Sequence, residues 1–156
     1  MKNKILKIIL IITILLIIFD QITKIIAKFN IHESREIGFF EISLIENQGI
    51  AFGMNNGNTQ NIVLTLVILG MIINFIIKQK EQIDLKTALA LSLILSGGIS
   101  NLLDRIIHGG VVDFIGIKNF AIFNMADCYI VVGWILMIIF VIKFSKGILG
   151  VKNCEK

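Results

Sequence analysis

Four long apolar stretches dominate this chain of 156 residues. They cover about residues 5–27, 61–77, 85–107 and 126–144, and each approaches the roughly 20 residues with which a helix crosses the hydrocarbon of a bilayer. Apolar residues make up 56% of the chain and charged residues 17%, which leaves too little polar surface to coat a soluble domain of this size. The sequence therefore predicts an all-α membrane protein, a four-transmembrane-helix bundle forming a single domain over residues 1–156.

The first stretch follows a basic N-terminal segment, as the apolar core of a cleaved signal peptide would. No small-x-small cleavage site follows it, so we expect a retained helix. Basic residues predict the orientation, because they concentrate on the cytoplasmic side of membrane proteins. If the chain crosses the membrane four times, both termini lie in the cytoplasm. The formal charge of +4 is then explained by basic residues that lie against anionic lipid head groups, and no nucleic-acid partner is expected. The predicted cytoplasmic lysines are Lys2, Lys4, Lys7, Lys78, Lys80, Lys86, Lys143, Lys146, Lys152 and Lys156, against Lys28, Arg35 and Lys118 outside.

Two outward connections separate these stretches, at residues 28–60 and 108–125. In the first, Phe40 and Ile42 alternate with Glu41 and Ser43, which is the period-two pattern of a half-buried strand. A small extracytoplasmic β element is therefore expected there, with residues 36–57 as a platform on which a peptide could add a strand. The second connection is expected to be a loop that contains Asp113.

Polar and charged residues gather where the threading places the outer ends of the helices. A charged side chain at the bilayer centre costs about 3 kcal/mol on insertion scales. Charged residues close to the predicted spans therefore require a structural or functional explanation. Ion pairing between residues one turn apart is one reading, and helix capping at the start of the last stretch is another. A shared function at one membrane face is the third, and we favour it because independent structural pairs have no reason to cluster. The group consists of Asp20, Lys24, Asn101, Asp104, Arg105, Asn124 and Asp127.

These regions contain five strings: 20–24 (DQITK), 47–53 (NQGIAFG), 97–105 (GGISNLLDR), 111–114 (VVDF) and 123–127 (FNMAD). Together they resemble the motifs of one known family, the lipoprotein signal peptidases or type II signal peptidases of bacteria. The resemblance covers nearly the whole chain, and the order of the strings makes it specific. Two positions depart from the family pattern: Ser100 stands where Gly is usual, and Ile50 where Ala is usual.

This resemblance implies an aspartyl endopeptidase of the bacterial cytoplasmic membrane whose active site lies at the extracytoplasmic face. The implied substrates are prolipoproteins, cut just before a cysteine that carries a diacylglyceryl group. Asp113 and Asp127 would form the catalytic dyad, because two close carboxyls share one proton and so offer a base and an acid together. Supporting or substrate-binding roles are implied for Asp20, Lys24, Asn47, Asn101, Asp104, Arg105 and Asn124, with Arg105 a candidate partner of Asp104.

The two aspartates are expected to differ in charge. Asp127 falls in the first turn of the last helix, where free amides and the helix dipole favour a carboxylate. Asp113 stands between Val112 and Phe114, whose apolar surroundings favour the neutral acid. We therefore expect Asp127 to be the resting base.

No cofactor or metal is expected, because His32 and His108 are isolated and no ligand spacing is visible. The expected partners are prolipoprotein signal peptides and membrane lipid, and the expected state is a monomer. Two other classes of protein remain open. A small channel or transport subunit could use the same charged residues as a polar path, and a membrane scaffold would use them only for packing.

Overall fold

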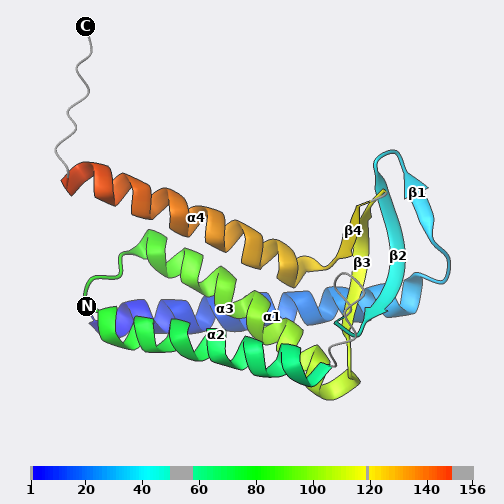
Figure 1. Cartoon of the computed structure of the whole chain (residues 1–156), viewed down its shortest axis with the longest axis horizontal. Helices are drawn as coiled ribbons and strands as arrows, with labels where there is room; N and C mark the ends of the chain where they lie inside the picture. Colours follow the sequence, from blue (N-terminus) through cyan, green and yellow to red (C-terminus); the bar gives the residue numbers. More distant parts are fainter. Residues whose placement is uncertain (1, 50–57, 119, 149–156) are drawn as a thin grey trace, which may run out of the picture.

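The structure is a computed structural model that describes residues 2–49, 58–118 and 120–148. Four helices lie with a small sheet across one end of the group (Figure 1). They are α1 (Lys2–Asn30), α2 (Asn58–Gln79), α3 (Leu85–His108) and α4 (Met125–Ile148). All four predicted helices are confirmed, with α3 within one residue of the predicted 85–107 and the others longer than predicted.

Three of these helices are long and apolar enough to cross a membrane: Lys4–Asn30, Asn58–Gln79 and Leu85–His108. In α4 the described apolar part, Met125–Phe140, is shorter than a full span. A mostly helical membrane protein is therefore confirmed, while the count of four spans stays a prediction.

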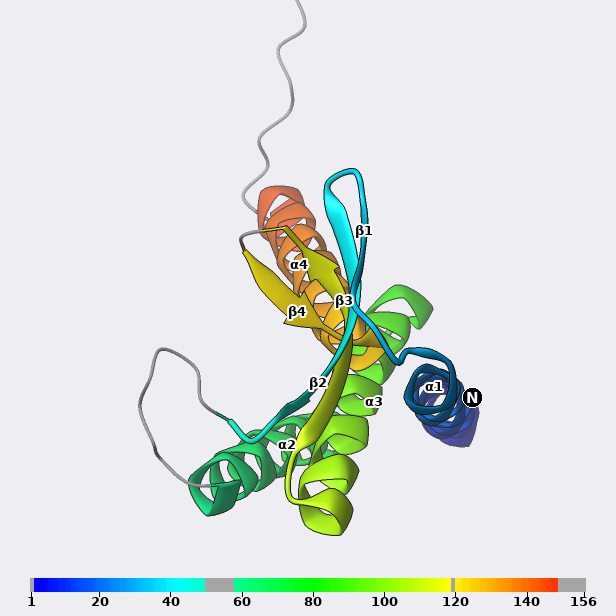
Figure 2. The same ribbon diagram turned by 90° about the vertical axis from the view of Figure 1, so that its right-hand side faces the viewer.

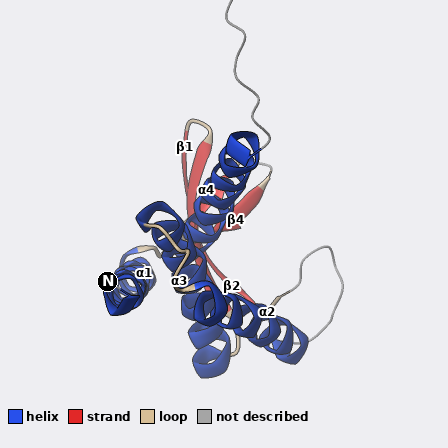
Figure 3. Ribbon diagram, turned by 90° about the vertical axis from the view of Figure 1, so that its left-hand side faces the viewer, coloured by secondary structure: helices blue, strands red, loops and turns tan. Residues whose placement is uncertain are grey.

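Helix α3 is the centre of the bundle and packs against α1, α2 and α4, as the end-on views in Figures 2 and 3 show. In the most apolar segment of α3, 67% of the residues are buried inside the protein, whereas the corresponding share for α2 is 11%. Small residues permit this packing, because a Cβ at Gly97 would collide with the backbone of Ala126, and one at Gly133 would lie 3.0 Å from the carbonyl oxygen of Ala90. The close contact at Gly97 holds the start of α4 against α3.

The sheet has four antiparallel strands in the order β1-β2-β3-β4. They are β1 (Arg35–Ile37), β2 (Phe40–Asn47), β3 (Val111–Ile117) and β4 (Ala121–Phe123). The strand element predicted in the first connection is confirmed by β1 and β2. The remainder of that region, residues 50–57 with Ile50, lies outside the described residues.

The prediction of a loop over 108–125 is wrong, because this connection forms β3 and β4. Asp113 consequently lies on a strand, opposite Ile45 of β2. Helix α3 ends at Gly109, whose φ of +78° is the left-handed conformation that reverses the chain into β3. The second connection thus completes the sheet that the first connection begins.

Candidate active site

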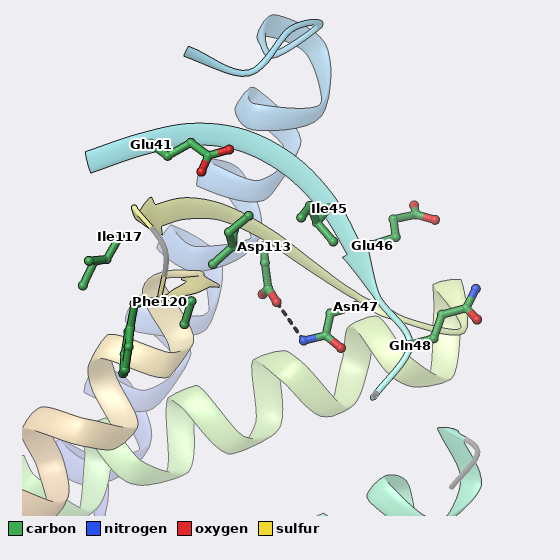
Figure 4. A pocket seen from close by; sticks show the side chains of 10 residues that line it. Glu41, Ile45, Glu46, Asn47, Gln48, Asp113, Ile117 and Phe120 are labelled. Atoms are coloured by element: carbon green, nitrogen blue, oxygen red, sulfur yellow. Dashed lines mark hydrogen bonds between the residues drawn. The ribbon is translucent and has the colours of Figure 1, made fainter. Parts of the chain in front are cut away.

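Asp113 is almost completely buried, with 3% of its surface exposed. Its two carboxyl oxygens accept hydrogen bonds from two asparagines: Oδ2 from Asn47 Nδ2 at 3.0 Å and Oδ1 from Asn124 Nδ2 at 2.6 Å. Figure 4 shows the bond to Asn47, which comes from the end of strand β2. Strand β3 and its pairing with β2 therefore position this carboxyl.

Asp127 lies in the first turn of α4. Its Oδ1 accepts a hydrogen bond from Asn101 Nδ2 at 2.8 Å, and its Oδ2 accepts one from the backbone N–H of Asn124 at 3.2 Å. In return, Asn124 Oδ1 accepts from the backbone N–H of Asp127 at 3.1 Å. This reciprocal pair is a capping box, so the capping interpretation of these two residues is confirmed.

Asn124 joins the two aspartates. It is fully buried, and its Nδ2 donates to Asn101 Oδ1 at 3.2 Å as well as to Asp113. Its backbone N–H donates to Asp127. The carboxyl from the sheet and the carboxyl from the helix therefore both bond to one residue, at the same end of the bundle.

A buried cation sits behind this group. Lys24 Nζ lies 2.7 Å from Asp20 Oδ2 and 2.8 Å from Asp104 Oδ2. Of the alternatives left open for Asp20 and Lys24, the ion pair one helical turn apart is therefore present. Lys24 also donates to Asn101 Oδ1 at 3.0 Å. Because that oxygen faces Lys24 and Asn124, the amide nitrogen of Asn101 is turned toward Asp127.

Asp20 also ties the first helix to the last. Its Oδ1 accepts a hydrogen bond from the backbone N–H of Ala126, in the first turn of α4, at 2.8 Å. A carboxylate is well placed there, since the first amides of a helix lack partners within the helix. The start of α4 is thereby fixed by α1 as well as by α3.

Arg105 differs from expectation. The expected pairing of Arg105 with Asp104 does not hold, because Asp104 pairs with Lys24 from α1. Arg105 instead directs its head group back along α3, with Nη1 donating to the carbonyl oxygen of Asn101 at 3.4 Å. Its Nε is buried without a hydrogen-bond partner among the described residues.

Two residues of the network had no predicted role, Gln21 and Ser100. Ser100 Oγ donates to Asp20 Oδ2 at 2.6 Å and accepts from Gln21 Nε2 at 2.9 Å. Gln21 Nε2 also lies 2.8 Å from Asp104 Oδ1. In the sequence, their positions inside two of the motif strings were the only indication that they belong to the site. Ser100, which departs from the Gly usual in the family, places a hydroxyl between α1 and α3.

We expect Ser100→Ala to destabilise the protein by about 1 kcal/mol, the usual net value of a buried hydrogen bond. The loss is limited because Asp20 keeps Lys24 and Gln21 keeps Asp104. The free energy of unfolding in mixed detergent and SDS measures it. Ser96→Ala is the matched control, since Ser96 is equally buried but its Oγ donates to the carbonyl oxygen of Leu93 within the same helix. Equal losses in the two variants would contradict the prediction.

Each aspartate borders a different hollow. One, of about 630 Å³, is lined by residues of β2, β3 and β4 and borders Asp113 (Figure 4). The other, of about 290 Å³, runs between α2, α3 and α4 and ends at Asp127, Asn101 and Arg105. The wall of the second hollow is otherwise mostly apolar, with Ile68, Leu69, Ile72, Ile94, Ile130 and Trp134.

Burial raises the pKa of Asp113 above its ordinary value of 3.8, and the nearby charge of Asp127 adds to this rise. The hydrogen bonds from Asn47 and Asn124 act in the opposite direction, but burial outweighs them. Burial therefore shifts the balance at Asp113 toward the neutral acid relative to an aspartate in water. Among the described residues, no group of three or more His, Cys, Asp or Glu side chains is placed to hold a metal ion.

Comparison with known proteins places the chain in a family. The family model described as "Signal peptidase (SPase) II" matches residues 12–143, which is most of the chain. The chain belongs to the signal peptidase II family. A lipoprotein signal peptidase of Staphylococcus aureus (strain JH9) is 37% identical over 147 residues, covering 88% of this chain and 90% of the relative. One of Fusobacterium nucleatum subsp. nucleatum is 33% identical over 141 residues, covering 85% of each chain.

Two solved structures are similar to this chain over most of its length. A bacterial membrane enzyme solved at 2.3 Å is 33% identical, with a TM-score of 0.78 over 95% of this chain and 93% of the other. A second, solved at 1.9 Å, is 35% identical, with a TM-score of 0.77 over 86% and 92%. The chain is accordingly a membrane protease of this family.

Proposed function

We propose that this signal peptidase II family member removes the signal peptide of prolipoproteins, cutting just before a diacylglyceryl-modified cysteine with Asp113 and Asp127 as the catalytic dyad. One observation carries the proposal. Two carboxyls from separate elements, a strand and a helix, both hydrogen-bond to Asn124. Asp127 lies at the end of the mostly apolar hollow between helices, and Asp113 borders the hollow beside the sheet.

In the proposed reaction the dyad holds one proton and a water molecule. Asp127 accepts a proton from the water as its oxygen attacks the scissile carbonyl carbon, and Asp113 gives its proton to the carbonyl oxygen. The C–N bond of the resulting tetrahedral intermediate then breaks. Asp127 passes its proton to the leaving amine nitrogen, and Asp113 takes back a proton from a hydroxyl of the intermediate. The raised pKa of Asp113 supports this order. Asn101 and Asn124 donate hydrogen bonds to the two oxygens of Asp127 and so hold this carboxylate in place.

The apolar hollow between α2, α3 and α4 suits the apolar segment of a signal peptide, because it runs inside the bundle from Asp127. The peptide must leave the helical state near the cut, since helical backbone is shielded from attack. In this proposal all four helices span the bacterial cytoplasmic membrane, both termini are cytoplasmic and the dyad faces outward. The enzyme acts as a monomer.

The rival role in transport is disfavoured by where the buried charges lie. A polar path would have to continue through the inner half of the bundle. Among the described side chains, the buried polar groups of that half are the hydroxyls of Thr13, Ser92 and Ser96. The charged groups stay together at the sheet end of the helices.

The direct test uses the purified full chain in bilayers with a precursor that carries the diacylglyceryl group. The expected products are a free signal peptide and a protein that begins with the lipidated cysteine, identified by mass. The same precursor without the lipid is the control and should be cut much more slowly. A cut at another bond, or solute flux across the bilayer without cleavage, would overturn the proposal.

The raised pKa of Asp113 predicts a pH dependence of stability. The folded state holds this proton more tightly than the unfolded state, so its contribution to stability is full below 3.8 and is lost as pH rises through the higher folded pKa. The Asp113→Asn variant lacks this titration. The free energy of unfolding of the parent minus that of the variant should therefore fall with rising pH. A difference that is constant from pH 3 to 8 would contradict the raised pKa.

A further inference from the structure

The far end of the sheet presents exposed apolar side chains, and two of them, Ile117 and Phe120, also line the hollow beside Asp113. We call this surface the hydrophobic sheet tip and define it as Ile37, Phe39, Phe40, Ile117 and Phe120. Their exposed fractions are 60%, 85%, 56%, 39% and 83%. The backbone N–H of Lys118 donates to the carbonyl oxygen of Phe39 at 3.0 Å, so the turns of both hairpins lie together and form one surface.

The two faces of the sheet differ in chemistry at this end. The register pairs Ile37 with Phe40 and Phe40 with Ile117, so these three side chains form a row on one face. The next row, Glu36 paired with Glu41, lies on the opposite face. Glu36 bonds to Lys118 Nζ at 2.6 Å. One face of the tip is therefore apolar, and the other is charged.

The apolar face is the one turned toward α4. Asp113 and Ile117 are four residues apart on β3, so they share a face, and Asp113 bonds to Asn124 immediately before α4. Figures 1 and 2 show that the sheet crosses the ends of the helices and that the β1–β2 hairpin extends past the start of α4. The apolar row therefore overhangs the space beside this helix.

That space is lipid if α4 lies in the membrane, because α4 exposes apolar side chains between residues 131 and 138. Val131, Val132, Ile135 and Ile138 are each about half exposed. Aromatic and apolar side chains that continue such a surface favour the membrane–water interface, while charged groups on the other face remain in water. We infer that the hydrophobic sheet tip is a membrane anchor that inserts into the outer leaflet beside α4.

This anchor has a structural consequence. Strand β3 carries both Asp113 and Ile117, so lipid contact at one end of the strand restrains the other end over α4. The inference concerns membrane contact alone. It stands or falls independently of whether Asp113 and Asp127 cut a peptide bond.

Neighbouring residues on β1 provide the test. Ile37→Trp and Glu36→Trp report on opposite faces, and Trp134→Phe first removes the single native tryptophan. Each variant is reconstituted as one copy per nanodisc, without substrate. Lipids that carry a quencher just below the head groups, and iodide in the water, are then compared. We expect the Ile37→Trp variant to lose most of its fluorescence to the lipid quencher and little to iodide, and the Glu36→Trp variant to do the reverse.

The same measurement at Phe39→Trp and Phe120→Trp keeps the test independent of any one substitution, since both side chains are more than 80% exposed and support no core. Lipid quenching at these two positions supports the anchor. Strong iodide quenching at 37, 39 and 120 overturns it. Lipid quenching that appears only after a lipidated precursor is added also overturns it, because the surface would then bind the diacylglyceryl group of the substrate. Protection that requires two copies per disc points to a dimer and overturns it as well.

Discussion

Replacing either aspartate by asparagine, Asp113→Asn or Asp127→Asn, is expected to lower precursor cleavage by on the order of 10³-fold or more. Asparagine keeps the size and some hydrogen bonds but cannot take a proton from water or carry the shared one. The two losses should not add in the double variant, because the carboxyls act as one unit. Cleavage of a lipidated precursor by the reconstituted protein, followed by mass, measures each rate.

Asp84→Asn is the matched control for these variants. Asp84 is the N-cap of α3, at the opposite end of that helix from Asn101 and Asp104. Its carboxylate accepts a hydrogen bond from the backbone N–H of Thr87 at 2.8 Å. Asparagine is an equally good cap, so cleavage and stability should stay near those of the parent. Folding of the dyad variants is checked by their unfolding curves. A folded Asp113→Asn protein that cleaves at the parental rate would refute the proposed dyad.

The second large effect is expected on stability at Lys24. Lys24→Met removes the cation between Asp20 and Asp104, and leaves two buried carboxyls without their charged partner. Breaking a buried pair from one side typically costs about 3–5 kcal/mol. The free energy of unfolding in mixed detergent and SDS should fall by this order. Cleavage should fall too, because Asn101 loses the contact that turns its amide nitrogen toward Asp127.

Lys118→Met provides the comparison, since Lys118 pairs with Glu36 on the exposed surface of the sheet. Water screens such a pair, and no measurable change in stability is expected. Adding Asp104→Asn to the Lys24→Met variant removes one unpaired carboxyl and should restore part of the lost stability. A Lys24→Met protein as stable as the Lys118→Met protein would show that the buried cation is not structural.

The helices were predictable because their signal is local. Twenty apolar residues in a row dictate a membrane helix whatever surrounds them, and α3 was placed within one residue. Alternation around Phe40 and Glu41 was equally local, and it predicted the strand region that contains β2. Strand β3 was missed because its sequence, Val-Val-Asp-Phe-Ile-Gly-Ile, alternates poorly and is stabilised by pairing with β2, some 70 residues earlier in the chain.

In the candidate site, too, the features with a local sequence signal were predictable, and those that depend on packing were not. Motif strings indicated which residues would gather, and the structure brings Asp113, Asp127, Asn101, Asn124 and Asn47 together. The sequence did not indicate which buried charged side chains would pair with one another. Asp104 has Arg105 beside it in the chain, yet pairs with Lys24 from another helix, because helix packing and not chain proximity decides which buried charges meet. Gln21 and Ser100 entered the network for the same reason.

The hydrogen bond between Asp20 and the backbone of Ala126 joins α1 to α4. A growing chain released only as far as β3 holds Asp113 but not yet Asp127, so it has half of the proposed machinery. Hydrolytic competence would then arise only once α4 has been made and has docked against α1 and α3. Until that moment the partly made chain would remain inert toward other membrane polypeptides.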